Sequence, residues 1–161
     1  MMQELGGLAG RILLAVALLY IASKRLLLWL FQVPGLVIIP VVWFWVYANE
    51  PQYFTLGVFL AGACIVSQFS YFGEYLPKVF PVHLRGTGGA FATNVGGRMI
   101  GTSAAFLTTG IIAPLLTSWT GGGPVTPQQV AFAAGVTGLL VFGVGFLVSL
   151  FLPQPPRDEK A

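Results

Sequence analysis

The chain has 161 residues, of which 56% are hydrophobic and only 8% are charged, and its mean hydropathy is +0.83. A soluble globular domain carries about 25% charged residues. The net charge of +3 comes from scattered basic residues rather than from a cluster. This composition excludes an ordinary soluble enzyme, a disordered protein and a nucleic-acid-binding protein, and it indicates an integral membrane protein with the lipid bilayer as its solvent.

Five segments are apolar and long enough to cross about 30 Å of hydrocarbon, which takes roughly 20 helical residues. In chain order they cover residues 5–22, 30–48, 53–73, 88–117 and 128–152. Their runs are continuously apolar, whereas the strands of a membrane barrel alternate apolar and polar residues over shorter stretches. The sequence therefore predicts an all-α, polytopic transmembrane helix bundle over residues 1–152, followed by a tail over residues 153–161.

The first span contains a charge at membrane depth. Arg11 lies six residues inside this segment, roughly 9 Å from its outer end at about 1.5 Å per residue. Its guanidinium either extends to the outer surface or faces a water-filled cavity, where it would bind an anion. No cation precedes the span to orient it. We therefore expect the chain to be the C-terminal piece of a longer protein.

Cations occur on alternate connections between the spans: Lys24 and Arg25, then Lys78 and Arg85, then Arg157 and Lys160 in the tail. The intervening connections, residues 49–52 and 117–129, contain none. Cytoplasmic loops are enriched in Lys and Arg. The alternation thus predicts cytoplasmic loops at residues 23–29 and 74–87, an external N-terminus and a cytoplasmic C-terminus.

Polar and small residues inside the spans have two interpretations. The polar ones are candidates for lining a solute pathway, or they form hydrogen bonds between helices: Arg11, Gln68, Asn94, Thr102 and Ser103. Small residues spaced four apart predict close helix packing, as at Gly6 and Gly10, Gly97 and Gly101, and Ala134 and Gly138.

The residues form no familiar catalytic or metal-binding set. The chain has one histidine and one cysteine, Cys64, which lies inside an apolar run. The glycines at positions 86, 88 and 89 fit neither a dinucleotide-binding loop nor a Walker A loop, because Phe91 stands where the third glycine belongs and no GK[ST] follows. We therefore predict no catalytic residue, no metal and no cofactor, and we expect that the protein is not an enzyme.

The connection between the third and fourth spans combines charges with turn-forming residues. Glu74 ends the third span, Arg85 precedes the fourth, and Arg98 lies about ten residues inside it. We interpret these three residues as an ion-pair network, with separate contacts to lipid headgroups as the alternative.

Prolines and glycines in the same connection predict a sharp turn. Pro77 and Pro81 are expected to stop the third helix. Gly86 and Gly88 are expected to let the chain turn back into the membrane, since glycine accepts backbone angles that other residues avoid.

The stretch GEYLPKVFPVHLRGTGGAFATNVGGRMIG, residues 73–101, resembles the major facilitator superfamily of secondary transporters. Members related to sugar and metabolite–proton symporters carry an acidic residue, an aromatic-plus-proline element, an arginine, and then RGxG where a glycine-rich helix begins. The matching residues here are Glu74, Pro81, Arg85, Gly86 and Gly88, and Arg98 resembles the arginine of the following helix. The segment of residues 22–29 departs from the family, because it keeps the cations and lacks the usual aspartate and glycine.

The resemblance implies that the five spans are helices eight to twelve of a twelve-helix transporter. Such a protein moves a small solute, here with protons, by rocking two six-helix halves about a central site. It further implies that the missing N-terminal half is a partner, that the location is a bacterial inner membrane, and that Glu74 and Arg85 form a state-dependent gate. The alternative class is a small membrane scaffold or assembly protein that does not transport.

The predicted topology can be tested by cysteine labelling. Because the cations alternate, Gly122→Cys should react with a membrane-impermeant thiol reagent added outside the cell, and Val82→Cys should not. The reverse labelling pattern would contradict both this topology and the alignment with the transporter family.

Overall fold

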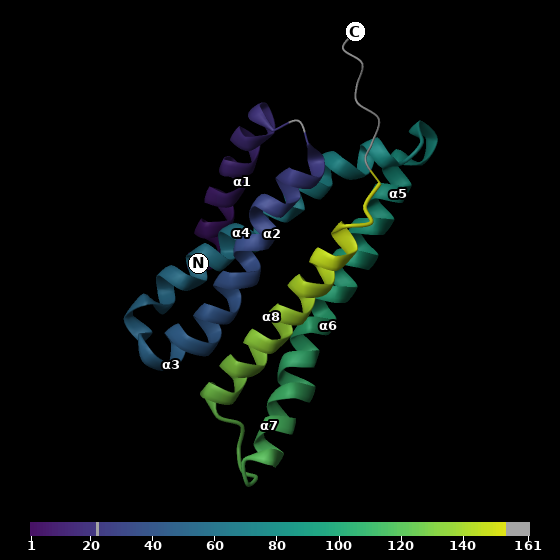
Figure 1. Cartoon of the computed structure of the whole chain (residues 1–161). Coiled ribbons are helices and arrows are strands. Elements are labelled where there is room, and N and C mark those ends of the chain that lie inside the picture. Colours follow the sequence, from purple (N-terminus) through teal and green to yellow (C-terminus); the bar gives the residue numbers. More distant parts are fainter. Residues whose placement is uncertain (22, 154–161) are drawn as a thin grey trace.

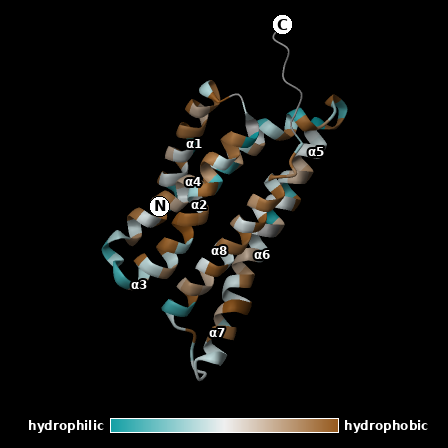
Figure 2. Cartoon of the chain, in the orientation of Figure 1, coloured by the Kyte–Doolittle hydropathy of each residue, from teal (hydrophilic) through white to brown (hydrophobic). Residues whose placement is uncertain are grey.

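The computed structural model describes residues 1–21 and 23–153, which form a bundle of helices without strands (Figure 1). Five helices in this part of the chain are long and apolar enough to cross a membrane: Met2–Tyr20, Arg25–Asn49, Pro51–Val79, Val82–Trp119 and Pro127–Ser149. Hydrophilic residues gather toward the helix ends and connections (Figure 2). The predicted all-α bundle with five spanning segments is confirmed, while most of the predicted tail, from residue 154, lies outside the described residues.

The second and fourth spans change helix type along their length, whereas the other three are single helices. The first span is α1 (Met2–Tyr20). The second span joins α2 (Lys24–Pro40), the π-helical η1 (Val41–Val46) and α3 (Tyr47–Asn49). The third and fifth are single helices, α4 (Pro51–Val79) and α8 (Pro127–Ser149). The fourth is built from η2 (Val82–Leu84), α5 (Arg85–Ala92), η3 (Thr93–Met99), α6 (Ile100–Phe106), η4 (Leu107–Ile112) and α7 (Ala113–Trp119).

The predicted loop over residues 23–29 is wrong, because the second helix already begins at Lys24. Ser23 caps this helix, and its side chain accepts a hydrogen bond from the backbone N–H of Leu26 at 3.4 Å. Leu27 and Leu28 are 0% and 2% exposed. Because these leucines are buried when they are helical, the second helix includes residues 24–29. The connection between the first two helices is therefore short, between the C-cap Ile21 and the N-cap Ser23.

The predicted loop over residues 74–87 is also too long. Helix α4 passes Pro77 and ends at Val79, so the expectation that Pro77 stops it is wrong. Phe80 is extended, with φ −85° and ψ 140°, as the residue before a proline usually is. Pro81 follows and immediately precedes the short helix η2, so the chain leaves α4 before the second proline, as expected.

Gly86 and Gly88 lie in α5, after the turn. Among the described residues, positive φ angles occur at Gly121, Gly122 and Gly123, in the connection before α8. The expected role of Gly86 and Gly88 in the turn is therefore wrong, because an extended residue and a proline already reverse the chain. Gly88 instead leaves room for the Phe80 ring, whose Cδ1 would lie 2.7 Å from a Cβ at this position.

Helices α1 and α4 pack at very close range through glycines. A Cβ on Gly6 or Gly10 would collide with the backbone carbonyl oxygens of Phe59 or Ala63. In return, Gly62 of α4 lies against the carbonyl of Gln3. This contact confirms the predicted small-residue packing for Gly6 and Gly10.

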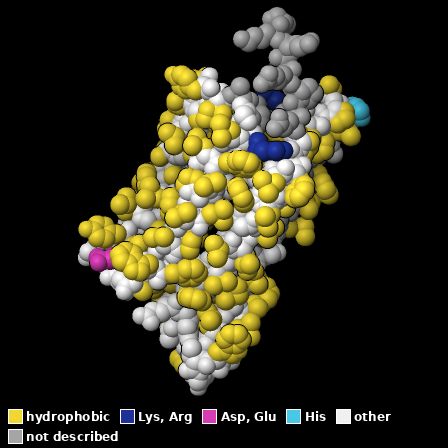
Figure 3. All heavy atoms as spheres, in the orientation of Figure 1, with side chains coloured by type: hydrophobic (Ala, Val, Ile, Leu, Met, Phe, Trp, Pro, Cys, Tyr) yellow, Lys and Arg dark blue, Asp and Glu magenta, His cyan; other side chains and the backbone are white. Residues whose placement is uncertain are grey.

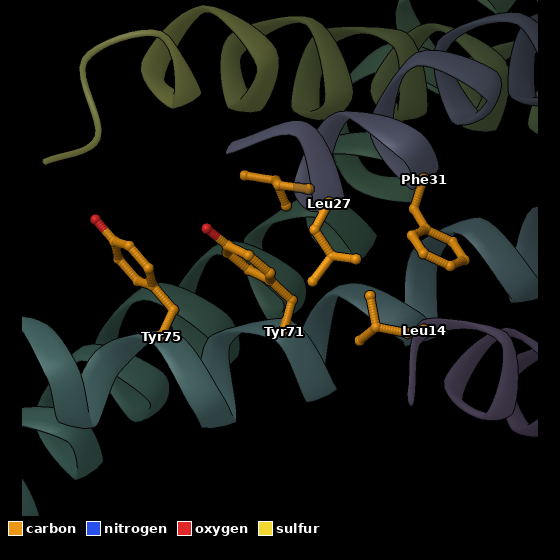
Figure 4. Close-up of a cluster of buried hydrophobic side chains, with 6 residues drawn as sticks. Leu14, Leu27, Phe31, Tyr71 and Tyr75 are labelled. Atoms are coloured by element: carbon orange, nitrogen blue, oxygen red, sulfur yellow. The ribbon is translucent and has the colours of Figure 1, made fainter. Parts of the chain in front are cut away.

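Buried aromatic and aliphatic side chains join the first three spans near one end of the bundle (Figure 4). The cluster combines residues from α1, α2 and α4: Leu14, Leu27, Leu28, Phe31, Tyr71 and Tyr75. A second cluster of Ile39, Ala61 and Phe142 adds α8 to α2 and α4. These two clusters place α2 and α4 at the centre of the bundle.

The fourth span is the least covered helix. Only 6% of its most apolar stretch is buried, against 22% to 39% for the other four spans. It touches α4 through α5 and runs beside α8 through α6, η4 and α7 (Figure 1). Thr108 donates to the hydroxyl of Thr137 at 2.8 Å, and Thr117 donates to Oε1 of Gln129 at 2.9 Å. The rest of its surface is open.

The α1–α4 contact predicts opposite effects for two glycine substitutions. Gly10→Ala should lower the free energy of unfolding by about 1–3 kcal/mol, because the new methyl group forces the helices apart. Gly73→Ala meets no atom within 4 Å and should gain about 0.5–1 kcal/mol from helix propensity. Thermal unfolding of the purified chain in detergent measures both, and equal midpoints for the two variants would contradict the close approach.

Candidate functional site

Arg98 lies close to the midpoint of the 38-residue fourth span, within the π-helical segment η3. Its side chain is exposed, and it forms no hydrogen bond or ion pair with the residues that the structure describes. The helix carries it far from both ends, at about 1.5 Å per residue. A guanidinium at this depth needs water or a polar partner, because exposing it to hydrocarbon costs at least a few kcal/mol.

Arg11 occupies the middle of α1. This helix begins at Met2 and has 19 residues, which places Arg11 roughly 14 Å from either end at about 1.5 Å per residue. The side chain is exposed. Because the helix begins earlier than expected, extension of the guanidinium to the outer surface is harder than the sequence suggested.

A polar row follows one face of the fourth span. Asn94, Arg98 and Thr102 are spaced four residues apart, and all three side chains are exposed. The amide nitrogen of Asn94 donates to the carbonyl of Ala90 at 2.8 Å. We call these three residues the polar row. π-Helical segments are found frequently at functional sites, where they interrupt the regular backbone hydrogen bonds.

The remaining pathway candidates lie elsewhere. Ser103 borders a shallow hollow between α6 and α8, together with Met99 and Val141. Gln68 of α4 is half-buried, and its amide nitrogen donates to the carbonyl of Cys64 at 3.2 Å. The structure brings Gln68 together with another polar residue, Gln32, which sequence reasoning missed.

Glu74 and Arg85, the two residues expected to form a gate, lie near the end of α4 and at the start of α5. Lys and Arg side chains are visible on the surface at the end of the bundle where the described chain finishes (Figure 3). Glu74 forms an ion pair with Lys78 at 3.0 Å, one helical turn along α4. Arg85 donates from Nε to the carbonyl of Phe80 at 3.4 Å and is exposed. The Glu74–Lys78 side chains are 31% and 33% exposed, so this pair contributes only about 0–1 kcal/mol. The pairing of Glu74 with Arg85 stays a prediction.

The same end holds a clamp on the last helix that sequence reasoning missed. Trp29 Nε1 donates to the hydroxyl of Ser149 at 3.0 Å, and Arg25 Nη2 donates to the carbonyl of Leu152 at 3.1 Å. Tyr75 donates its phenolic hydroxyl to the carbonyl of Pro153 at 2.5 Å. Because residues 23–29 were expected to form a loop, no contact of Arg25 or Trp29 with the last helix was predicted.

The described residues contain no group of three or more His, Cys, Asp and Glu side chains placed to hold a metal ion. Comparison with known proteins identified no matching family model, no matching curated protein and no matching solved structure.

The clamp predicts that Ser149→Ala destabilises the bundle. Ser149 is 1% exposed, so losing its hydroxyl leaves the Trp29 N–H without its acceptor and should cost about 1–3 kcal/mol. Ser118→Ala is a matched control, since Ser118 is exposed and bonds only within its own helix, to the carbonyl of Leu115. Thermal unfolding in detergent compares them, and in a Trp29→Phe background the Ser149→Ala penalty should shrink. An unchanged penalty in that background would show that the two side chains act separately.

Proposed function

We propose that the chain is the C-terminal part of a secondary transporter of the major facilitator type, which moves a small solute by alternating access with proton coupling. The observation that carries this proposal is the exposed Arg98 at mid-span, within the polar row, which pairs with none of the described residues. In this assignment the five spans are helices eight to twelve, in a multi-pass protein of a bacterial inner membrane with its N-terminus outside.

The solvation that a guanidinium group requires supports water-filled surroundings for the polar row. Arg98 has five N–H donors and no acceptor among the described residues, and Arg11 is likewise exposed at mid-span. Neither guanidinium has a carboxylate partner in the described structure, so each is available to an anionic group of a solute. A transport pathway supplies the polar environment that the bilayer lacks.

The arrangement of residues 73–101 also supports the proposal. Helix α4 ends at Val79, the chain reverses at Phe80 and Pro81, and the glycine-rich α5 begins directly afterwards. This is the helix–turn–helix layout that the resemblance to the transporter family implies for these residues. The uncovered surface of the fourth span is then the side on which the other transporter half lies.

The same uncovered surface favours the alternative function. A scaffold or assembly protein would use an open, little-buried helix to bind a membrane partner. The two functions differ in what surrounds the polar row, because a pathway contains water and a helix–helix interface excludes it.

Cysteine accessibility in the native membrane separates the two functions. We expect cysteines at Asn94, Arg98 and Thr102 to react with a hydrophilic, sulfonate-bearing thiol reagent. Leu139→Cys and Leu147→Cys, on exposed apolar positions of α8, serve as controls and should not react. A polar row as unreactive as these controls would contradict a pathway and support the scaffold.

Transport by the chain alone is a second test. Since a central pathway lies between two pseudo-symmetric halves, these five spans alone should not concentrate a solute in proteoliposomes. Proton-dependent accumulation by the reconstituted chain would contradict this expectation and would require an oligomer that rebuilds the missing half.

The gate is tested by charge exchange in the complete transporter. We propose that Glu74 leaves Lys78 for Arg85 when the cytoplasmic end closes, with burial under neighbouring helices strengthening the pair. Arg85→Gln should slow transport and leave expression and substrate binding largely unchanged. The exchange Glu74→Arg with Arg85→Glu should restore part of the rate, and an exchange no better than either single change would point to separate roles.

A further inference from the structure

A cavity of about 500 Å³ lies between α2, α4 and α8, and no residue of the polar row lines it. Its walls are mostly apolar, and none of the lining side chains is charged. Two amide side chains interrupt the apolar wall, Gln32 from α2 and Gln68 from α4. Ligand sites in proteins commonly have this composition, with an apolar wall and few polar groups.

Gln32 is the unusual residue of this wall. It is only 4% exposed, and its Oε1 has no hydrogen-bond partner among the described residues. The other end of the amide lies against α8, where a Cβ on Gly145 would come 3.1 Å from Nε2. The glycine therefore provides the space that lets this amide sit at the helix contact.

The orphaned oxygen is costly and calls for a donor. A buried carbonyl without a hydrogen bond loses about 1–3 kcal/mol relative to a satisfied one. The nearby polar side chains do not bond to it: Gln68 donates one N–H to the carbonyl of Cys64, and the Ser149 hydroxyl donates to the carbonyl of Phe146 at 2.6 Å and accepts from Trp29. The missing partner is a group that donates a hydrogen bond.

The surroundings define the rest of that partner. An ammonium ion would find no carboxylate in this wall, whereas a hydroxyl is neutral and donates one hydrogen bond. The apolar side chains, including Leu28, Phe72 and Val148, suit a hydrocarbon or aromatic body. Molecules of this kind dissolve in the bilayer and reach the cavity from there.

We propose that the cavity between α2, α4 and α8 binds an apolar alcohol or phenol, whose hydroxyl donates to Gln32 Oε1 while its body lies against the apolar wall. This site shares no residue with the polar row, and the proposal does not depend on transport. Occupancy would join the three helices that form the centre of the bundle.

The test uses a photoreactive phenol and its methyl ether on the purified full chain in detergent. 4-Hydroxybenzophenone carries the donor, and 4-methoxybenzophenone has nearly the same shape without it. Adducts are mapped by mass spectrometry of peptides from α2, α4 and α8. We expect half-maximal labelling by the phenol at a concentration roughly tenfold lower than by the ether, as for one hydrogen bond in an apolar site.

Variants and competitors identify the acceptor. Gln32→Met removes the amide oxygen at similar size and should abolish the preference for the phenol. Gln52→Met, which changes an exposed glutamine in the first turn of α4, should keep it. Excess 1-decanol should reduce labelling of the unmodified chain and decane should not, which tests the site even where Gln32→Met fails to fold.

Three results would overturn the proposal. Equal labelling by phenol and ether would mean that acyl chains or detergent fill the cavity. Absence of cavity labelling by either probe would mean that water alone satisfies Gln32. A Gln32→Met variant that folds and keeps the preference for the phenol would place the acceptor elsewhere.

Discussion

Hydrocarbon offers no hydrogen-bond partner, so every polar group inside these helices must find one within the protein. The fourth span shows the simplest solution, in which a side chain donates to the carbonyl one turn back: Asn94 to Ala90, Thr93 to Gly89 and Thr109 to Ala105. The hydroxyls of Thr108 and Thr117 instead link this span to α8, through Thr137 and Gln129. These hydrogen bonds explain how a helix with many hydroxyl and amide side chains remains apolar enough to span a membrane.

Arg98 and Gln32 each have polar atoms that form no hydrogen bond with the described residues. Arg98 is exposed at mid-span, and the carbonyl oxygen of the buried Gln32 accepts no hydrogen bond from the part of the chain that the structure describes. The two differ in the surroundings they require. A guanidinium with five donors requires water or an anion, which supports a pathway along the polar row, whereas one neutral acceptor in an apolar wall requires one donor. The two proposals therefore stand on different residues, in different parts of the bundle.

The number of spans was predictable because hydropathy reports how much chain must be hidden from water, and five apolar runs give five helices. The ends of the helices were not predictable in the same way, because charged residues also occur inside helices. Arg25 and Lys78 are both helical, and their long side chains find partners, Arg25 at the Leu152 carbonyl and Lys78 at Glu74. Gln32 is visible in the sequence as the one amide between Leu26 and Pro40, but its contact with α8 involves Gly145, more than a hundred residues later in the chain.

Glycines in the first and fourth spans have contrasting surroundings, and this contrast bears on what covers the fourth span. At Gly6 and Gly10 the space of a Cβ is occupied by the backbone of α4. At Gly86, Gly89, Gly96 and Gly101 no described atom lies within 4 Å of that position. Glycine in an exposed helix is about 1 kcal/mol less favourable than alanine, so four such residues lower the stability of the helix unless close packing compensates. A second helix packed against this surface would compensate, and the mid-span Arg98 would then face the junction between the two helices. In the proposed transporter that junction is the solute pathway.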